Sequence, residues 1–177
     1  AYWVAESLSE TVASACSLEE AVRGDERLGE EMVGWVASHP FIDRESPVLP
    51  ADYVTMDSGT GCVHTAPGHG LDDYLTGQAH GLDTYCPLDD HGSYLDDGQI
   101  PESLVGVSVL EKATGCPAND KVLEILEATG DLLALSDYSH QYPHCWRSKT
   151  PVVFRAMDQW FVSLDKDGLR EKCLEEV

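Results

Sequence analysis

The chain has 177 residues, a length that fits one folded domain with a core of its own. Hydrophobic residues make up 42% of it, no apolar stretch approaches the roughly 20 residues that span a bilayer, and its six cysteines are scattered without a CxxC pair. These features exclude a disordered chain, a membrane-spanning segment and a disulfide-stapled scaffold. We therefore expect a reduced, cytoplasmic protein.

Charge is the unusual property of this sequence. Eleven Lys and Arg residues stand against thirty-two Asp and Glu, which gives a net charge of −21. Such a chain repels nucleic-acid phosphates at ordinary ionic strength. Eight of the eleven basic residues lie from Lys112 onward, and none lies between Arg44 and Lys112. Two compatible explanations stay open: a high-salt environment, which screens repulsion within about 3 Å at 1 M, or an acidic lobe of a larger protein that grips nucleic acid elsewhere.

The first third of the chain predicts short elements. Leu8 and Val12 share one helical face with Ala15 and Cys16, so a helix is expected over 6–16. Capping-box spacing at 17–20 predicts the start of a second, short helix. Residues 35–37 form a candidate strand that stops at His39-Pro40, and a strand, turn and strand are expected over 53–56, 57–59 and 62–65.

The remaining elements alternate between short helices and candidate strands. A short helix is expected over 71–80 and a longer one over 118–129, with Gly130 as its stop signal. Residues 83–103 are expected to form a loop with short strands. Further candidates are strands at 105–110, 132–135, 152–155 and 160–163, and a helix from 167 onward. This order predicts a mixed α/β fold, with a twisted or barrel-like sheet at its centre and short helices around it.

One stretch of sixteen residues concentrates the chemistry: 59–74, which is GTGCVHTAPGHGLDDY. His64 lies in the β-like run 62–65, Gly68-His69-Gly70 forms a loop, and Asp72 and Asp73 occupy the first turn of the helix that follows. Glycines let a ligand approach the main chain closely, and a helix start offers spare N–H donors. The stretch therefore predicts a site for a small molecule or a nucleotide.

Both acidic residues and the histidine also have plain structural explanations. Carboxylates in a first helical turn stabilise the helix dipole by about 0.3–1 kcal/mol, and His64 could be hydrogen-bonded at a sheet edge. However, Asp72 and Asp73 project about 100° apart on a helix. One of them can therefore face the loop and clamp an ammonium group through charge-assisted hydrogen bonds. The structural and functional explanations both stay open on this pattern.

The same stretch carries residue types that bind metals but no complete metal or cofactor motif. His64, His69, Asp72 and Asp73 are residue types that zinc accepts, but neither HExxH nor paired-cysteine spacing is present. A GxSxG nucleophile motif is missing, and the glycine runs match neither GxGxxG nor a Walker loop. We expect no metal ion and no nucleotide cofactor in this domain.

The run GTGCVHTAPGHGLDDY resembles the signature of the editing domain that is inserted in isoleucyl-tRNA synthetases. Three further stretches agree in the same order: His39-Pro40-Phe41, YPHCWR at 142–147, and KTPVVFRA at 149–156 running on to Gln159-Trp160-Phe161. Together they cover the chain from about residue 30 to its end. The editing domains of valyl- and leucyl-tRNA synthetases are related alternatives, but they carry different residues at Val-His-Thr and Gly-His-Gly.

The resemblance implies a β-barrel-like core decorated with helices. It implies hydrolysis of valine wrongly attached to the isoleucine tRNA, and of valyl-adenylate, by water with help from a substrate hydroxyl and without a metal or a covalent enzyme intermediate. The implied partners are the tRNA 3′ end that carries valine and the remainder of the synthetase chain, in a monomer. ATP and Mg²⁺ would be used by the parent synthetase and not by this domain.

The resemblance also assigns roles by position. Asp73 would hold the α-amino group of the substrate, His64 would line the side-chain pocket and exclude isoleucine, and the Gly68-His69-Gly70 loop would lie near the terminal adenosine. Thr65 and Asp72 complete the expected substrate-binding set.

The same resemblance implies a division of the chain into two parts. Residues 1–145 would be the editing domain without the family's threonine-rich segment, and 146–177 a return segment toward the synthetic core. Because that segment is missing and the charge is strongly negative, a non-catalytic tRNA-docking or structural insertion is the alternative.

Overall fold

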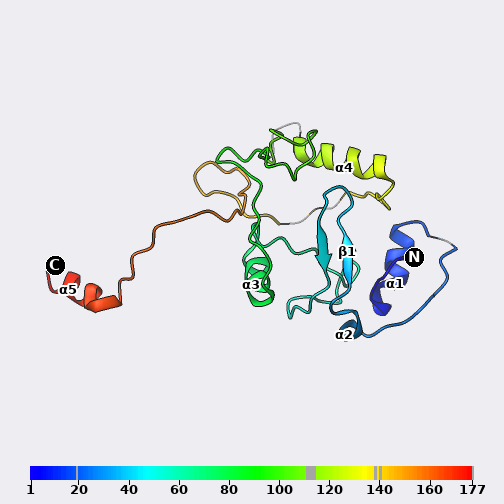
Figure 1. The fold of residues 1–177 in the computed structure, drawn as a ribbon, viewed down its shortest axis with the longest axis horizontal. Coiled ribbons are helices and arrows are strands. Elements are labelled where there is room, and N and C mark those ends of the chain that lie inside the picture. The colour runs from blue at the N-terminus through cyan, green and yellow to red at the C-terminus, as the bar shows by residue number, and fades with distance from the viewer. Residues whose placement is uncertain (19, 111–114, 138, 140, 177) are drawn as a thin grey trace.

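Short helices and one small sheet make up the computed structural model, which describes residues 1–18, 20–110, 115–137, 139 and 141–176 (Figure 1). The architecture is therefore mixed, as the sequence predicts. In chain order the elements are the 3₁₀ helix η1 (Glu6–Leu8), α1 (Ser9–Ala15), α2 (Gly29–Met32), β1 (Val36–Ser38), β2 (Glu45–Pro47), α3 (Leu71–His80), α4 (Pro117–Thr129), the 3₁₀ helix η2 (Lys166–Gly168) and α5 (Leu169–Glu175).

Local start and stop signals explain the helices that were predicted correctly. α3 follows extended Gly70 and ends at Gly81, whose φ of 70° is left-handed. α4 has Pro117 in its first turn and ends at Gly130 with φ 79°. The helix expected over 6–16 is present as η1 and α1, and the one expected from 167 is α5. Among the described residues, no helix is long and apolar enough to cross a membrane.

The sheet consists of β1 and β2, paired antiparallel with Val36 opposite Pro47, Ala37 opposite Ser46 and Ser38 opposite Glu45. The strand expected at 35–37 is thus confirmed, shifted by one residue. The turn between the strands is closed by the His39 amide, which donates to the Arg44 carbonyl at 3.0 Å.

The other predicted strands are wrong. None of the segments 53–56, 62–65, 105–110, 132–135, 152–155 and 160–163 is a strand. Outside β1 and β2, the isolated bridges between two described partners are Leu88–Tyr94, Ser93–Ser108 and His144–Pro151. Alternation alone does not supply a hydrogen-bonded neighbour, and Met56 and Val63 are each 54% exposed. The sheet is open in the described part of the chain, so the barrel-like core is not confirmed.

The second helix expected from Ser17 is also wrong where it can be followed. Ser17 has a left-handed φ of 52°, and residues 17, 18 and 20 are not helical. A left-handed residue directly after a helix ends it, because the next backbone amide no longer points along the helix axis. Residue 19 of this prediction lies outside the described residues.

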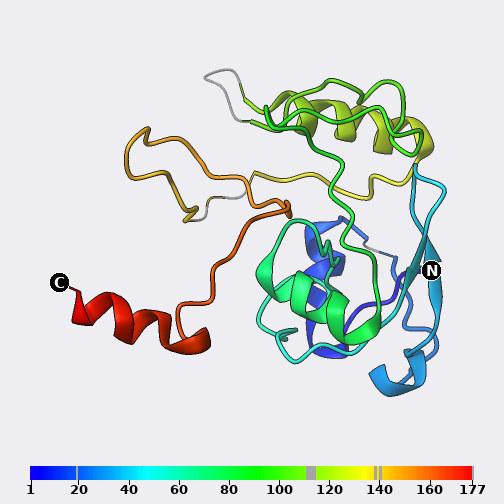
Figure 2. The ribbon, with the colours of Figure 1, turned by 60° about the vertical axis from the view of Figure 1, so that its left-hand side comes forward.

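The buried core of the described residues is small and lies mainly in the 88–104 loop and its neighbours. Its buried apolar side chains are Leu8, Leu88, Ile100, Leu104 and Ala118. By contrast, the segment that leads to α5 stands away from the body of the chain in two views (Figures 1 and 2). Trp160 in that segment is fully exposed. The domain division at 145/146 stays a prediction.

Candidate functional site

Asp73 closes the loop that precedes α3. Its Oδ1 accepts a hydrogen bond from the Ala66 amide at 2.9 Å, and the His69 amide donates to the Ala66 carbonyl at 2.8 Å. A Cβ atom placed on Gly70 would lie 2.1 Å from Asp73 Oδ2, so only glycine allows the carboxylate to sit there. The half-buried Asp73 side chain therefore fixes the shape of the 66–70 loop.

The two neighbouring carboxylates diverge as helical geometry requires. Asp73 is half-buried against the loop, whereas Asp72 is exposed. Within the described residues Asp73 Oδ2 has no hydrogen-bond donor, which leaves one carboxylate oxygen for a ligand. The assignment of an ammonium-binding role to Asp73, and of a substrate contact to Asp72, stays a prediction.

Gly68 is held between two segments that are distant in sequence. It is buried, and a Cβ atom on it would lie 2.1 Å from the Tyr85 carbonyl oxygen. The Ala156 amide donates to the Gly68 carbonyl at 2.7 Å, and His69 Nδ1 lies 3.0 Å from the Phe154 carbonyl oxygen. We call residues 154–156 the strap, because they lie across this loop.

A wide hollow of about 2580 Å³ opens beside the loop, bordered by the N-terminal helices, the sheet, residues 61–67 and His69. Three of the predicted site residues line it: His64, which is exposed, Thr65 and His69. Tyr53 also lines it, with its hydroxyl 3.1 Å from Thr65 Oγ1. The other predicted residues, Gly68, Gly70, Asp72 and Asp73, are not among those that line the hollow.

Sequence reasoning did not group His64 with two further basic side chains on the wall of this hollow. His39, His64 and Arg44 all line it, and Arg44 stacks over the Tyr85 ring at 4.2 Å from the centroid. Burial, with smaller contributions from His64 and Arg44, lowers the pKa of His39. The available signals were the His39-Pro40 dipeptide and the position of Arg44 as the last cation before Lys112.

Tyr85 links this group to the loop at 95–100. Its hydroxyl donates to Asp97 Oδ2 at 2.6 Å, and burial together with that carboxylate raises the pKa of Tyr85 to about 12. The phenol is therefore protonated at neutral pH and acts as a hydrogen-bond donor. Its backbone carbonyl meanwhile lies against Gly68.

A pH dependence of stability follows from His39. Its Nδ1 accepts the amides of Phe41 at 3.3 Å and Ile42 at 3.1 Å, contacts that are lost if Nδ1 is protonated. Its folded pKa lies below the ordinary value of about 6.5, so the unfolded chain binds more protons as pH falls below that value. We expect the free energy of unfolding to fall as the pH is lowered from neutral through that value, and His39→Asn, whose amide oxygen can accept a bond, to reduce this slope. Urea titrations at several pH values test it, and equal slopes in both proteins would contradict the assignment.

The structure also bears on the zinc alternative. Among the described residues there is no group of three or more His, Cys, Asp or Glu side chains close enough to hold a metal ion. His64 and His69 face the hollow, whereas Asp73 turns toward Ala66. These residues do not form a ligand set in the part of the chain that the structure describes.

Comparison with known proteins identifies the class to which this fold and loop belong. A family model described as "Leucyl-tRNA synthetase, editing domain" matches residues 4–99, more than half of the chain. The chain belongs to the editing-domain family of class I aminoacyl-tRNA synthetases.

The relatives of the chain indicate which synthetase of this class carries such a domain. Proteins named isoleucine–tRNA ligase are 48% identical over 174 residues in Nitratidesulfovibrio vulgaris (strain DP4), 41% over 177 in Petrotoga mobilis and 47% over 149 in Carboxydothermus hydrogenoformans. These alignments cover 98%, 99% and 84% of this chain, but only 18%, 18% and 15% of the relatives. The domain is therefore an editing domain of the isoleucyl-tRNA synthetase family, and it spans less than a fifth of the length of these relatives. Membership implies hydrolysis of aminoacyl-tRNA as its general chemistry.

Proposed function

We propose that this domain removes valine from the isoleucine tRNA, and hydrolyses valyl-adenylate, as part of an isoleucine–tRNA ligase. The observation that carries the proposal is the half-buried Asp73 carboxylate in the first turn of α3. One of its oxygens accepts the Ala66 amide, and the other has no donor among the described residues. The relatives named isoleucine–tRNA ligase support the choice of tRNA.

The physical need for such an activity is well defined. A binding pocket discriminates between side chains that differ by one methylene by only about 1–3 kcal/mol. Isoleucyl-tRNA synthetase is the general example of this limit, because it prefers isoleucine over valine by only roughly 150-fold. Translation requires a larger ratio. A second pocket that admits valine and excludes isoleucine supplies the difference by hydrolysis.

In the proposed mechanism, Asp73 Oδ2 accepts a charge-assisted hydrogen bond from the valine ammonium group. The Gly68-His69-Gly70 loop lies near the terminal adenosine, and Thr65 offers its hydroxyl to the substrate beside Tyr53. Water attacks the ester carbonyl, the bond from that carbon to the ribose oxygen breaks, and the ribose leaves as its hydroxyl form. The neighbouring substrate hydroxyl assists the attack by water. Asp72 belongs to the substrate-binding set and contacts the substrate from the exposed side of the helix.

The setting of the domain is part of the same proposal. Residues 1–145 serve as the editing unit and 146–177 lead toward the synthetic core of a monomeric, cytoplasmic synthetase. That core uses ATP and Mg²⁺, whereas the editing unit needs no cofactor. The barrel-like sheet that the resemblance implies would require strands that pair with the open edges of β1 and β2.

A second candidate function is non-catalytic docking of tRNA. It is favoured by the position of Asp73, which already binds the Ala66 amide and does not line the hollow. A deacylation assay on the full-length synthetase separates the two functions. Retained tRNA binding without hydrolysis of Val-tRNA(Ile) would favour docking.

His64→Ala tests the exclusion of isoleucine. His64 is exposed on the wall of the hollow, so its removal enlarges the space for the amino-acid side chain. We expect hydrolysis of correctly charged Ile-tRNA(Ile) to rise by about 10-fold or more, the effect of one methylene in a pocket. His80→Ala is the matched control, because His80 is exposed at the end of α3 and does not line the hollow. Unchanged discrimination in His64→Ala would contradict the assignment.

A further inference from the structure

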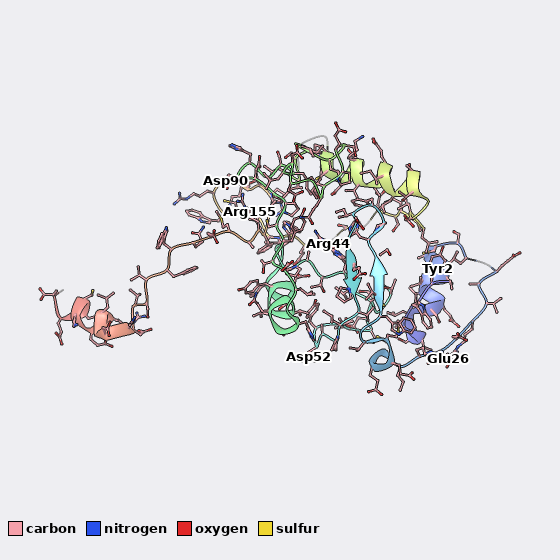
Figure 3. The ribbon with its side chains drawn as sticks, in the orientation of Figure 1. Tyr2, Glu26, Arg44, Asp52, Asp90 and Arg155 are labelled. Atoms are coloured by element: carbon pink, nitrogen blue, oxygen red, sulfur yellow. The ribbon has the colours of Figure 1, made fainter. Side chains whose placement is uncertain are left out.

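Arg155, in the middle of the strap, reaches a different part of the chain from its two neighbours. Its Nη2 donates to Asp90 Oδ1 at 2.8 Å, and Figure 3 shows these two side chains near each other. Its Nη1 donates to the Asp89 carbonyl. The Arg155 side chain is 22% exposed, whereas that of Asp90 is 82% exposed. Arg155 Nε is buried without a hydrogen-bond partner in the described part of the chain.

The residues on either side of Arg155 bind the site loop instead. The Phe154 carbonyl faces His69 Nδ1, and the Ala156 amide donates to the Gly68 carbonyl. Backbone groups of the strap thus hold the loop while the Arg155 side chain holds the 85–90 connection. Arg155 is the side chain that joins them.

The 85–90 connection also contacts the loop directly, since the Tyr85 carbonyl leaves no space for a side chain at Gly68. The loop is therefore in contact with both the strap and this connection. The loop in turn orients the Asp73 carboxylate, through the hydrogen bond from the Ala66 amide and the close contact with Gly70.

Stability alone does not account for this arrangement. An ion pair whose partner is mostly exposed contributes little to folding, because solvent screens it. Burying a guanidinium with Nε unpartnered is unfavourable as well. The arrangement fixes geometry. Two hydrogen bonds of Arg155 set the distance between the strap and the 85–90 connection, and the loop contacts both.

We propose that Arg155 is a positioning residue for the hydrolysis, acting through the strap and the Gly68-His69 loop on the Asp73 carboxylate. The inference rests on the proposed function. It makes the strap, which begins the segment leading to α5, a mechanical link between the editing site and the C-terminal part of the chain.

The test uses the full-length synthetase that carries this domain, with Arg155→Ala and Arg155→Lys. Deacylation of preformed Val-tRNA(Ile) is followed for kcat and KM separately, and aminoacylation is measured in parallel. A displacement of about 1 Å at a reacting centre costs about 100-fold, so we expect kcat of Arg155→Ala to fall by about 10- to 100-fold. KM and aminoacylation should stay at the parental values, and Arg155→Lys should recover part of kcat by restoring the charge and one donor.

Arg170→Ala is the matched control, because Arg170 makes an ion pair of the same 2.8 Å length with Asp165 beside α5. It should deacylate at the parental rate. Parental kcat in Arg155→Ala would overturn the inference, as would an equal loss of deacylation and aminoacylation, which would mean general structural support. Absence of deacylation in the parent enzyme is a separate result, which overturns the proposed function and this inference with it.

Discussion

Asp73→Asn is expected to lower kcat/KM for deacylation of Val-tRNA(Ile) by more than about 30-fold while aminoacylation by the same enzyme is unchanged. The amide keeps an oxygen for the Ala66 N–H, so the loop retains its shape, but it has no negative charge for the valine ammonium group. Removing one partner of a hydrogen-bonded charge pair costs about 2–5 kcal/mol, which sets this range. Deacylation and aminoacylation assays on the full-length synthetase measure it.

A second variant separates the loss of charge from the loss of loop shape, and a third is the control. Asp73→Ala removes both the charge and the acceptor for Ala66, so its loss should equal or exceed that of Asp73→Asn. Asp120→Asn is the matched control, because Asp120 is an exposed carboxylate in the first turn of α4. A parental deacylation rate in Asp73→Asn would remove Asp73 from the mechanism.

Gly68→Ala is expected to have the second large effect. An added Cβ would lie 2.1 Å from the Tyr85 carbonyl oxygen, and a backbone atom cannot swing aside as a flexible side chain can. The loop would have to move by more than about 1 Å, which corresponds to about a 100-fold loss of deacylation. Overpacking at a buried position also destabilises a fold by about 1–3 kcal/mol.

The measurements for Gly68→Ala are single-turnover deacylation and the protease sensitivity of the 66–70 loop, compared with Gly24→Ala. Gly24 is exposed, its φ is not left-handed and a Cβ atom there meets nothing within 4 Å, so the control should match the parent in both assays. If Gly68→Ala deacylated normally, the close packing of the loop against Tyr85 would not matter for the reaction.

Helix ends were predictable from the sequence because their signals are local. Gly81 and Gly130 stop α3 and α4 by adopting left-handed backbone conformations, and Pro117 fits a first helical turn. Strands depend on a neighbour that alternation does not reveal. Residues 62–65 alternate well, yet they pair with no strand among the described residues, and Val63 stays exposed.

In the candidate site, too, the local features could be predicted from the sequence and the long-range contacts could not. Its residue types were visible in one short stretch, and the divergence of Asp72 and Asp73 follows from helix geometry. The enclosure of Gly68 could not be predicted, because it depends on Tyr85 and on a strap that lies more than eighty residues further along the chain. The approach of His39 to His64 likewise results from the turn between β1 and β2.

The claim that Asp73 binds the ammonium group can be tested most directly with a substrate that lacks it. The parent synthetase and Asp73→Asn would each be given Val-tRNA(Ile) and the same tRNA esterified with 2-hydroxyisovalerate, in which a hydroxyl replaces the ammonium group. The account predicts that the parent hydrolyses the hydroxy-acid ester more slowly by about the factor that Asp73→Asn loses on the valine ester, and that Asp73→Asn treats both esters alike. Equal rates on both esters in the parent, or an equal loss on both in Asp73→Asn, would contradict it.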